Sequence, residues 1–152
     1  MNEQPDPQAF AQTFPNVKLV VLFGSQARGC ATTQSDWDLA YQFWQPVSAW
    51  EELDLSLKLA MYLGIPTDDL DAVNLWGCSP LLAQIIASEG KLIYEAEPGL
   101  FAWFRVKSWK QYLDTAKFRQ LQGESIRRGL ERLRHQGPGS LSMPTRERPS
   151  HE

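Results

Sequence analysis

The first hundred residues alternate between short apolar runs and longer amphipathic segments, which predicts strands separated by helices. The clearest apolar run covers residues 17–23, is rich in β-branched side chains and ends at a glycine, so it predicts a buried strand. Further strands are predicted at residues 36–44, 70–75 and 91–95. Capping residues and helical spacing predict helices at residues 7–14, 48–63 and 81–88. This order of elements predicts an α/β (α+β) fold with a mixed sheet flanked by helices.

The helix predicted at residues 48–63 has apolar side chains at helical spacing. Leu53, Leu57, Ala60 and Met61 recur at intervals that place them near one another on the helix surface. We therefore expect this face to pack on the core.

A long helical extension is predicted after Pro98-Gly99. Its pattern covers residues 100–122 and 124–135, with Gly123 between them as a hinge. The sequence beyond it is rich in glycine and proline, which predicts an unstructured end. The chain is thus expected to comprise a domain at residues 1–98, a basic helical extension at 99–136 and a flexible tail at 137–152.

Charge is distributed unevenly along the chain. Residues 1–100 hold four Lys or Arg against 13 Asp or Glu, a net charge of −9, whereas residues 101–136 hold nine against three, a net charge of +6. A basic surface of this kind suits a partner protein, RNA or the chain's own acidic domain, and it is also the composition of a solvated helix face. No stretch has the length of a membrane span and the polar N-terminus is not a signal peptide, so a cytoplasmic protein is expected.

The stretch from residue 24 to residue 39 concentrates the side chains that suit chemistry. Gly24 and Ser25 directly follow the first strand, where a glycine lets the backbone approach a ligand and a serine adds a hydroxyl at a phosphate-binding helix start. Asp36 and Asp38 follow after ten residues. Two neighbouring carboxylates repel each other unless a cation lies between them, so the pair predicts a site for a hard divalent metal that in turn binds phosphate oxygens.

The string Gly-Ser-x-Ala-Arg-Gly from Gly24, followed by Ser-Asp-x-Asp-Leu from Ser35, resembles the signature of the DNA polymerase β-like nucleotidyltransferases. It is most similar to their minimal nucleotidyltransferase branch, whose members are commonly antitoxins paired with HEPN-domain ribonuclease toxins. The resemblance covers about residues 17–95 and fixes a turn, a spacing and a carboxylate pair together. It implies the mixed sheet of that fold, ATP as the nucleotide and two Mg2+ ions.

The resemblance also implies which carboxylates bind metal. A third acidic residue of the family lies on a neighbouring strand in the pattern apolar, Asp, apolar, apolar, and Asp71 matches that position. Asp36, Asp38 and Asp71 are therefore the implied catalytic residues and metal ligands, and Asp71 is also implied to help deprotonate the attacking hydroxyl. Asp69, two residues earlier on the same face, is the reserve candidate.

On the same resemblance, the triphosphate of ATP lies against Gly24 and Ser25. Arg28 either assists in phosphate binding or is a surface residue. A hydroxyl attacks the α-phosphorus and pyrophosphate leaves. In the antitoxin branch the implied acceptor is a tyrosine hydroxyl on a cognate HEPN ribonuclease toxin, which is silenced when AMP is attached.

The residues alone leave other functions open. A degenerate nucleotidyltransferase would neutralise its partner by masking it, although a pure binder has no need to keep three carboxylates together. A small-molecule acceptor usually requires a substantial further domain, and about fifty residues remain for one. Transfer onto RNA stays an alternative because of the basic C-terminal helix.

Overall fold

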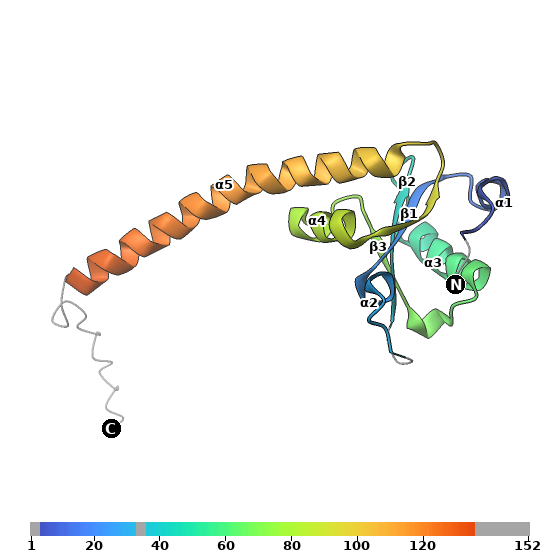
Figure 1. Cartoon of the computed structure of the whole chain (residues 1–152), viewed down its shortest axis with the longest axis horizontal. Helices are drawn as coiled ribbons and strands as arrows, with labels where there is room; N and C mark the ends of the chain where they lie inside the picture. Colours follow the sequence, from blue (N-terminus) through green and yellow to red (C-terminus); the bar gives the residue numbers. More distant parts are fainter. Residues whose placement is uncertain (1–3, 33–35, 136–152) are drawn as a thin grey trace, which may run out of the picture. The chain divides into compact units, whose positions relative to one another are not determined.

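The computed structural model describes residues 4–32 and 36–135. Within these residues it confirms every predicted strand and helix of the first hundred positions (Figure 1). The flexible tail predicted at residues 137–152 lies outside the described residues. The elements in chain order are α1 (Pro7–Thr13), β1 (Val17–Phe23), α2 (Gly24–Arg28), β2 (Trp37–Phe43), α3 (Ala49–Leu63), the 3₁₀ helix η1 (Thr67–Asp69), β3 (Leu70–Asn74), α4 (Pro80–Glu89), β4 (Lys91–Glu95) and α5 (Leu100–His135).

The described strands form one mixed sheet in the order β3-β2-β1-β4. Strand β1 is antiparallel to β2 and to β4, whereas β2 and β3 are parallel. Every residue of β1 except Lys18 is buried, which explains why this strand reads as a nearly continuous apolar run rather than as an alternation.

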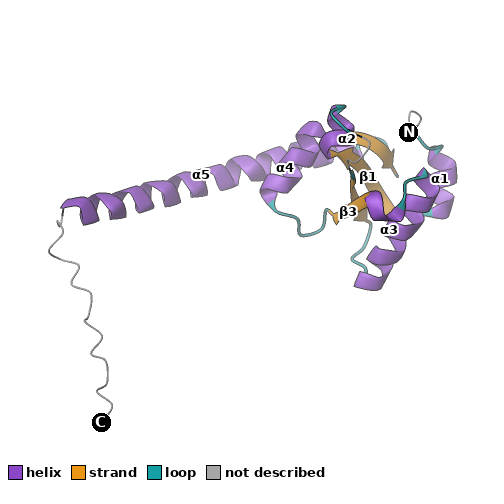
Figure 2. Ribbon diagram, turned by 90° about the horizontal axis from the view of Figure 1, so that it is seen from below, coloured by secondary structure: helices purple, strands orange, loops and turns teal. Residues whose placement is uncertain are grey.

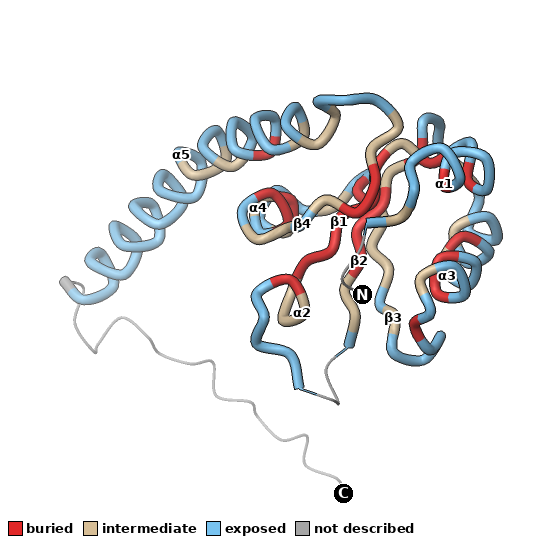
Figure 3. Tube along the Cα trace, turned by 45° about the vertical axis from the view of Figure 1, so that its right-hand side comes forward, coloured by how far each residue is buried: buried red, intermediate tan, exposed pale blue. Residues whose placement is uncertain are grey.

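Helices cover both faces of this sheet. Figure 2 shows the strands between α1 and α3 on one side and α4 on the other. One face of β1, with Val20 and Leu22, packs with Phe10 of α1 and Leu59 of α3. The opposite face, with Leu19 and Val21, belongs to a second cluster that includes residues of α4 and of the first turn of α5. The buried positions concentrate along the central strands (Figure 3).

The prediction that Leu53, Leu57, Ala60 and Met61 of α3 pack on the core is wrong for three of these four residues. Leu55, Leu59 and Ala60 are buried, whereas Leu53, Leu57 and Met61 are 51%, 45% and 78% exposed. The helix has apolar residues on two faces, so its periodicity does not by itself decide which face is buried. Packing against the sheet selects the Leu55–Leu59 face.

A pair of substitutions on α3 tests this orientation. We expect Leu59→Ala to lower the free energy of unfolding by about 2–5 kcal/mol, because it removes a side chain that is fully buried. Leu57→Ala, two residues away on the exposed side, should change it by about 0.5 kcal/mol or less. Urea denaturation of both variants measures the difference, and equal losses would contradict the orientation of the helix.

Helix α5 runs without a break from Leu100 to His135, so the hinge predicted at Gly123 is wrong. A glycine inside a helix costs about 1 kcal/mol relative to alanine, which strong helix formers on either side easily offset. The chain divides into two compact units, Met1–Asp114 and Thr115–Glu152, so α5 contributes to both.

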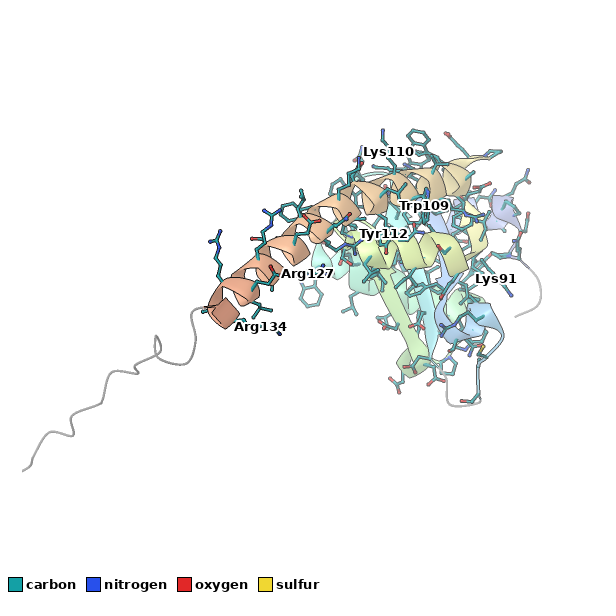
Figure 4. All side chains as sticks on the ribbon, turned by 60° about the vertical axis from the view of Figure 1, so that its left-hand side comes forward. Lys91, Trp109, Lys110, Tyr112, Arg127 and Arg134 are labelled. Atoms are coloured by element: carbon teal, nitrogen blue, oxygen red, sulfur yellow. The ribbon has the colours of Figure 1, made fainter. Side chains whose placement is uncertain are left out.

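The described part of the second unit is helical and surface-exposed. Phe118, Leu121, Ile126, Leu130 and Leu133 are each more than half exposed. Figure 4 shows Arg127 and Arg134 on this part of α5. None of the helices in residues 4–32 and 36–135 combines the length and the apolar character that crossing a membrane requires.

Candidate active site

The turn that ends β1 brings the backbone directly against a carboxylate. Gly24 has a φ of 73°, a left-handed conformation that favours glycine. A Cβ atom built at this position would overlap Oδ2 of Asp38. Gly24 is therefore required both for the backbone conformation and for the close approach of the chain to Asp38. Ser25 follows as the second residue of the short helix α2, which ends at Gly29.

Strand register places the predicted acidic residues at one edge of the sheet. Asp38 of β2 is the cross-strand neighbour of Phe23 in β1 and of Asp71 in β3. Asp36 immediately precedes β2. Because β2 and β3 are parallel, both begin at this edge, and the antiparallel β1 ends there. The structure therefore gathers Gly24, Asp38 and Asp71 around the end of one strand and the starts of two others.

The three carboxylates differ in exposure and influence one another. Asp36 and Asp71 are exposed, whereas Asp38 is half-buried. Burial raises the pKa of Asp38, and the negative charges of Asp71 and then Asp36 raise it further, while Arg28 lowers it. The ionised form of Asp38 is thus disfavoured in the folded chain, which is the situation that a bound cation relieves.

The donor atoms of this edge suit magnesium in kind, because carboxylate oxygens are hard ligands. Within the described residues, no group of three Asp, Glu, His or Cys side chains is already gathered closely enough to form a metal site. The three carboxylates therefore lie at the same edge of the sheet and repel one another, but they are not yet close enough together to bind one metal ion. The reserve candidate Asp69 is an exposed residue at the end of η1, whereas Asp71 is the one in register with Asp38.

Arg28 has a partner that the sequence did not indicate. Its Nη1 lies 3.7 Å from Oε1 of Glu89, the last residue of α4, in a partly exposed ion pair. The two residues are far apart in the chain and no motif links them. Only the contact between α2 and α4 in the fold brings them together. Arg28 therefore pairs with Glu89 while its positive charge also lowers the pKa of Asp38.

Asp38→Asn is expected to stabilise the protein in metal-free buffer at pH 7. The pKa of Asp38 is raised on folding, so the folded chain binds this proton more tightly than the unfolded chain. The cost of the charge is therefore present at neutral pH and disappears as the pH falls through the titration of this carboxyl. The variant should raise Tm by on the order of 2 °C at pH 7, and the gain should shrink in acid.

Thermal unfolding in EDTA across this pH range measures the effect. Asp54→Asn, at an exposed aspartate on α3, is the matched control and should give no such gain. A lower Tm for Asp38→Asn at pH 7 in EDTA would contradict the electrostatic description of this edge.

Comparison with known proteins identifies the class to which this fold and site belong. A family model described as "Polymerase beta, Nucleotidyltransferase" matches residues 8–98. The chain belongs to this nucleotidyltransferase family. It is also similar to the protein adenylyltransferase MntA of Aphanizomenon flos-aquae, with 30% identity over 130 residues that cover 78% of this chain and 83% of the relative.

Solved structures of toxin–antitoxin systems share the fold. A crystal structure of a toxin–antitoxin with AMP-PNP superposes with a TM-score of 0.63 and 26% identity, covering 78% of this chain and 93% of the other. A structure of a tri-AMPylated Shewanella oneidensis HEPN toxin in complex with an MNT antitoxin gives a TM-score of 0.58 and 24% identity, covering 78% of this chain and 90% of the other. Both matches cover a larger share of this chain than the family model, which matches residues 8–98.

Proposed function

We propose that this protein is an antitoxin that transfers AMP from ATP to a tyrosine hydroxyl of a HEPN ribonuclease toxin and thereby neutralises it. The observation that carries the proposal is the register that places Asp38 beside Asp71 at the edge where Gly24 passes the same carboxylate. The similarity to a protein adenylyltransferase supports the reaction. The AMP-PNP and AMPylated-toxin structures support ATP as the donor and a HEPN toxin as the acceptor.

Asp36, Asp38 and Asp71 are the residues that would hold Mg2+, with two ions in this proposal. The metal would supply positive charge to offset the negative charge that builds on the phosphoryl oxygens. The mutual repulsion at Asp38 is consistent with this role, because it is a cost that binding of a cation removes.

The remaining steps depend on the side chains and backbone of this chain. Gly24 and Ser25 receive the triphosphate, since no Cβ atom blocks the backbone at Gly24 and Ser25 offers its hydroxyl. Arg28, held by Glu89, contributes positive charge beside them. A tyrosine oxygen of the toxin forms a bond to the α-phosphorus, the bond from that phosphorus to the bridging oxygen breaks, and pyrophosphate leaves. Asp71 accepts the tyrosine proton.

Exposure of the site favours a protein acceptor. Asp36 and Asp71 are both exposed at the sheet edge, so a side chain on the surface of another protein can approach them. A small-molecule transferase would instead be expected to enclose its acceptor in a concave pocket. The reaction consumes ATP, and the proposal places the protein in the cytoplasm, where that substrate is plentiful.

Growth of cells that express a HEPN-domain ribonuclease toxin tests whether neutralisation requires transfer. Co-expression of the wild-type chain should restore growth. The Asp36→Asn/Asp38→Asn double variant should fail to restore it while still binding the toxin in a pull-down. Rescue by the double variant at equal expression would instead show that the chain neutralises its partner by masking it.

A further inference from the structure

The outer side of α3 presents a stripe of large apolar side chains to solvent. Trp50, Leu53, Leu57 and Met61 are 80%, 51%, 45% and 78% exposed. Their spacing of three, four and four residues aligns them along about 16 Å of the helix, and we call them the outer stripe. Figure 3 shows the buried positions of α3 toward the strands and the exposed ones on the outer side.

Such a stripe marks a docking surface. Isolated exposed apolar residues are common on soluble proteins, but a contiguous row that includes a tryptophan and a methionine is not. Tryptophan is also the side chain most enriched at the energetic centres of protein interfaces. None of the four residues belongs to the candidate active site, and the core-packing residues of α3 lie on its other side.

Two charged residues flank the outer stripe on one side. Asp54 and Lys58 are one helical turn apart and form an ion pair, with 2.7 Å between Oδ2 and Nζ. Both side chains remain about 60% exposed, so this pair leaves each charge accessible to a partner. The surface is therefore an apolar row with one acidic and one basic residue beside it, in a fixed order along the helix.

This order makes the surface complementary to itself. A two-fold axis midway between residues 55 and 56 would set α3 antiparallel to the α3 of a second copy, with Trp50 opposite Met61. The same operation brings Asp54 opposite Lys58 of the other copy with an offset of about 1.5 Å along the helix axis. Both symmetry-related contacts then pair an aspartate with a lysine. A two-fold interface uses the same surface on both copies, so this surface must be complementary to itself.

We propose that the outer stripe of α3 binds a second copy of this chain through antiparallel, two-fold packing. The four apolar residues of each copy cover those of the other, and the two ion pairs become a cluster of four alternating charges. The buried surface would be on the order of 1,000 Å² in total, which is near the lower limit for a specific interface. An interface of this size is typical of weak, transient association, so we expect a dimer in the micromolar range. This inference does not depend on the proposed function.

Sedimentation equilibrium of the full chain over a range of micromolar concentrations tests the proposal, with charge variants that distinguish a self-complementary surface from any other. Asp54→Lys places lysines opposite lysines, and Lys58→Asp places aspartates opposite aspartates, so each should raise the dimer Kd about tenfold. The double variant Asp54→Lys/Lys58→Asp keeps opposite charges opposed and should recover the wild-type Kd to within about threefold. An equimolar mixture of the two single variants should form a heterodimer.

Two controls accompany these variants. Lys107→Asp, at an exposed position on α5, changes the net charge as Lys58→Asp does and should leave the dimer unaffected. Trp50→Glu should weaken the dimer at least tenfold without lowering Tm, because that side chain is exposed in the monomer. A wild-type chain that stays monomeric at the highest concentration overturns the proposal. So does a double variant that dimerises no better than the two single variants, since dimerisation would then not depend on opposite charges facing each other at this surface.

Discussion

Replacing Asp36 and Asp38 together with asparagine should lower the rate of AMP transfer to the toxin by about a thousandfold or more. Asparagine retains the size of each side chain but removes the two negative charges that would hold Mg2+ at the sheet edge. Without the metal, the negative charge that develops on the phosphoryl oxygens is not compensated. Electrostatic stabilisation of the transition state is usually the largest single contribution to catalysis, so its loss should lower the rate strongly. The rate is measured as label transferred from α-labelled ATP to the toxin.

Asp69→Asn is the matched control for this double variant. Asp69 is an exposed aspartate two residues from Asp71, but it ends η1 and is not in register with Asp38. Its replacement should change the rate less than threefold. If Asp69→Asn were as damaging as the double variant, the third carboxylate of the site would have to be reassigned from Asp71 to Asp69.

Gly24→Ala should reduce transfer at least a hundredfold. The alanine Cβ would overlap the Asp38 carboxylate, so either this carboxylate or the turn after β1 must move. A displacement of about 1 Å in a catalytic constellation can cost this much, because the reacting groups lose their alignment. The positive φ of Gly24 adds about 1–2 kcal/mol of backbone strain for any residue with a Cβ.

Gly29→Ala separates strain from steric overlap. Gly29 also has a positive φ, at 72°, but a Cβ there meets no described atom within 4 Å. Both variants should lose stability through backbone strain, and Gly24→Ala should lose more in urea denaturation because of its overlap with Asp38. Only Gly24→Ala should lose the larger part of its activity. Comparable activity in the two variants would show that the approach of Gly24 to Asp38 is not needed for transfer.

The candidate site could be predicted from the sequence because its residues belong to a short motif placed by strand ends. Gly24 follows an apolar run that is too short for a helix and predicts a buried strand, and Asp71 is the second residue of a predicted strand. Once β2 and β3 run parallel, Asp38 and Asp71 become neighbours through register alone. The local sequence patterns and the parallel pairing of β2 with β3 therefore explain why Gly24, Asp38 and Asp71 lie together at this edge.

Contacts between distant elements could not be predicted in the same way. The Arg28–Glu89 ion pair depends on where α4 lies relative to α2, and neither sequence pattern contains that information. The sequence predicts the wrong buried face for α3 because leucines occur on both sides of this helix. Hydrophobic periodicity therefore identifies a helix there but does not identify its buried face. The apolar residues on the exposed side of α3 form the outer stripe, which we propose as a dimer interface.

Intact-mass spectrometry of the purified HEPN toxin, after incubation with the wild-type chain, ATP and Mg2+, tests the central claim most directly. We predict a gain of one or more AMP units, located on tyrosine by peptide mapping and abolished when EDTA replaces Mg2+. A toxin of unchanged mass that is nevertheless bound and inhibited would contradict the account, because neutralisation would then require no transfer.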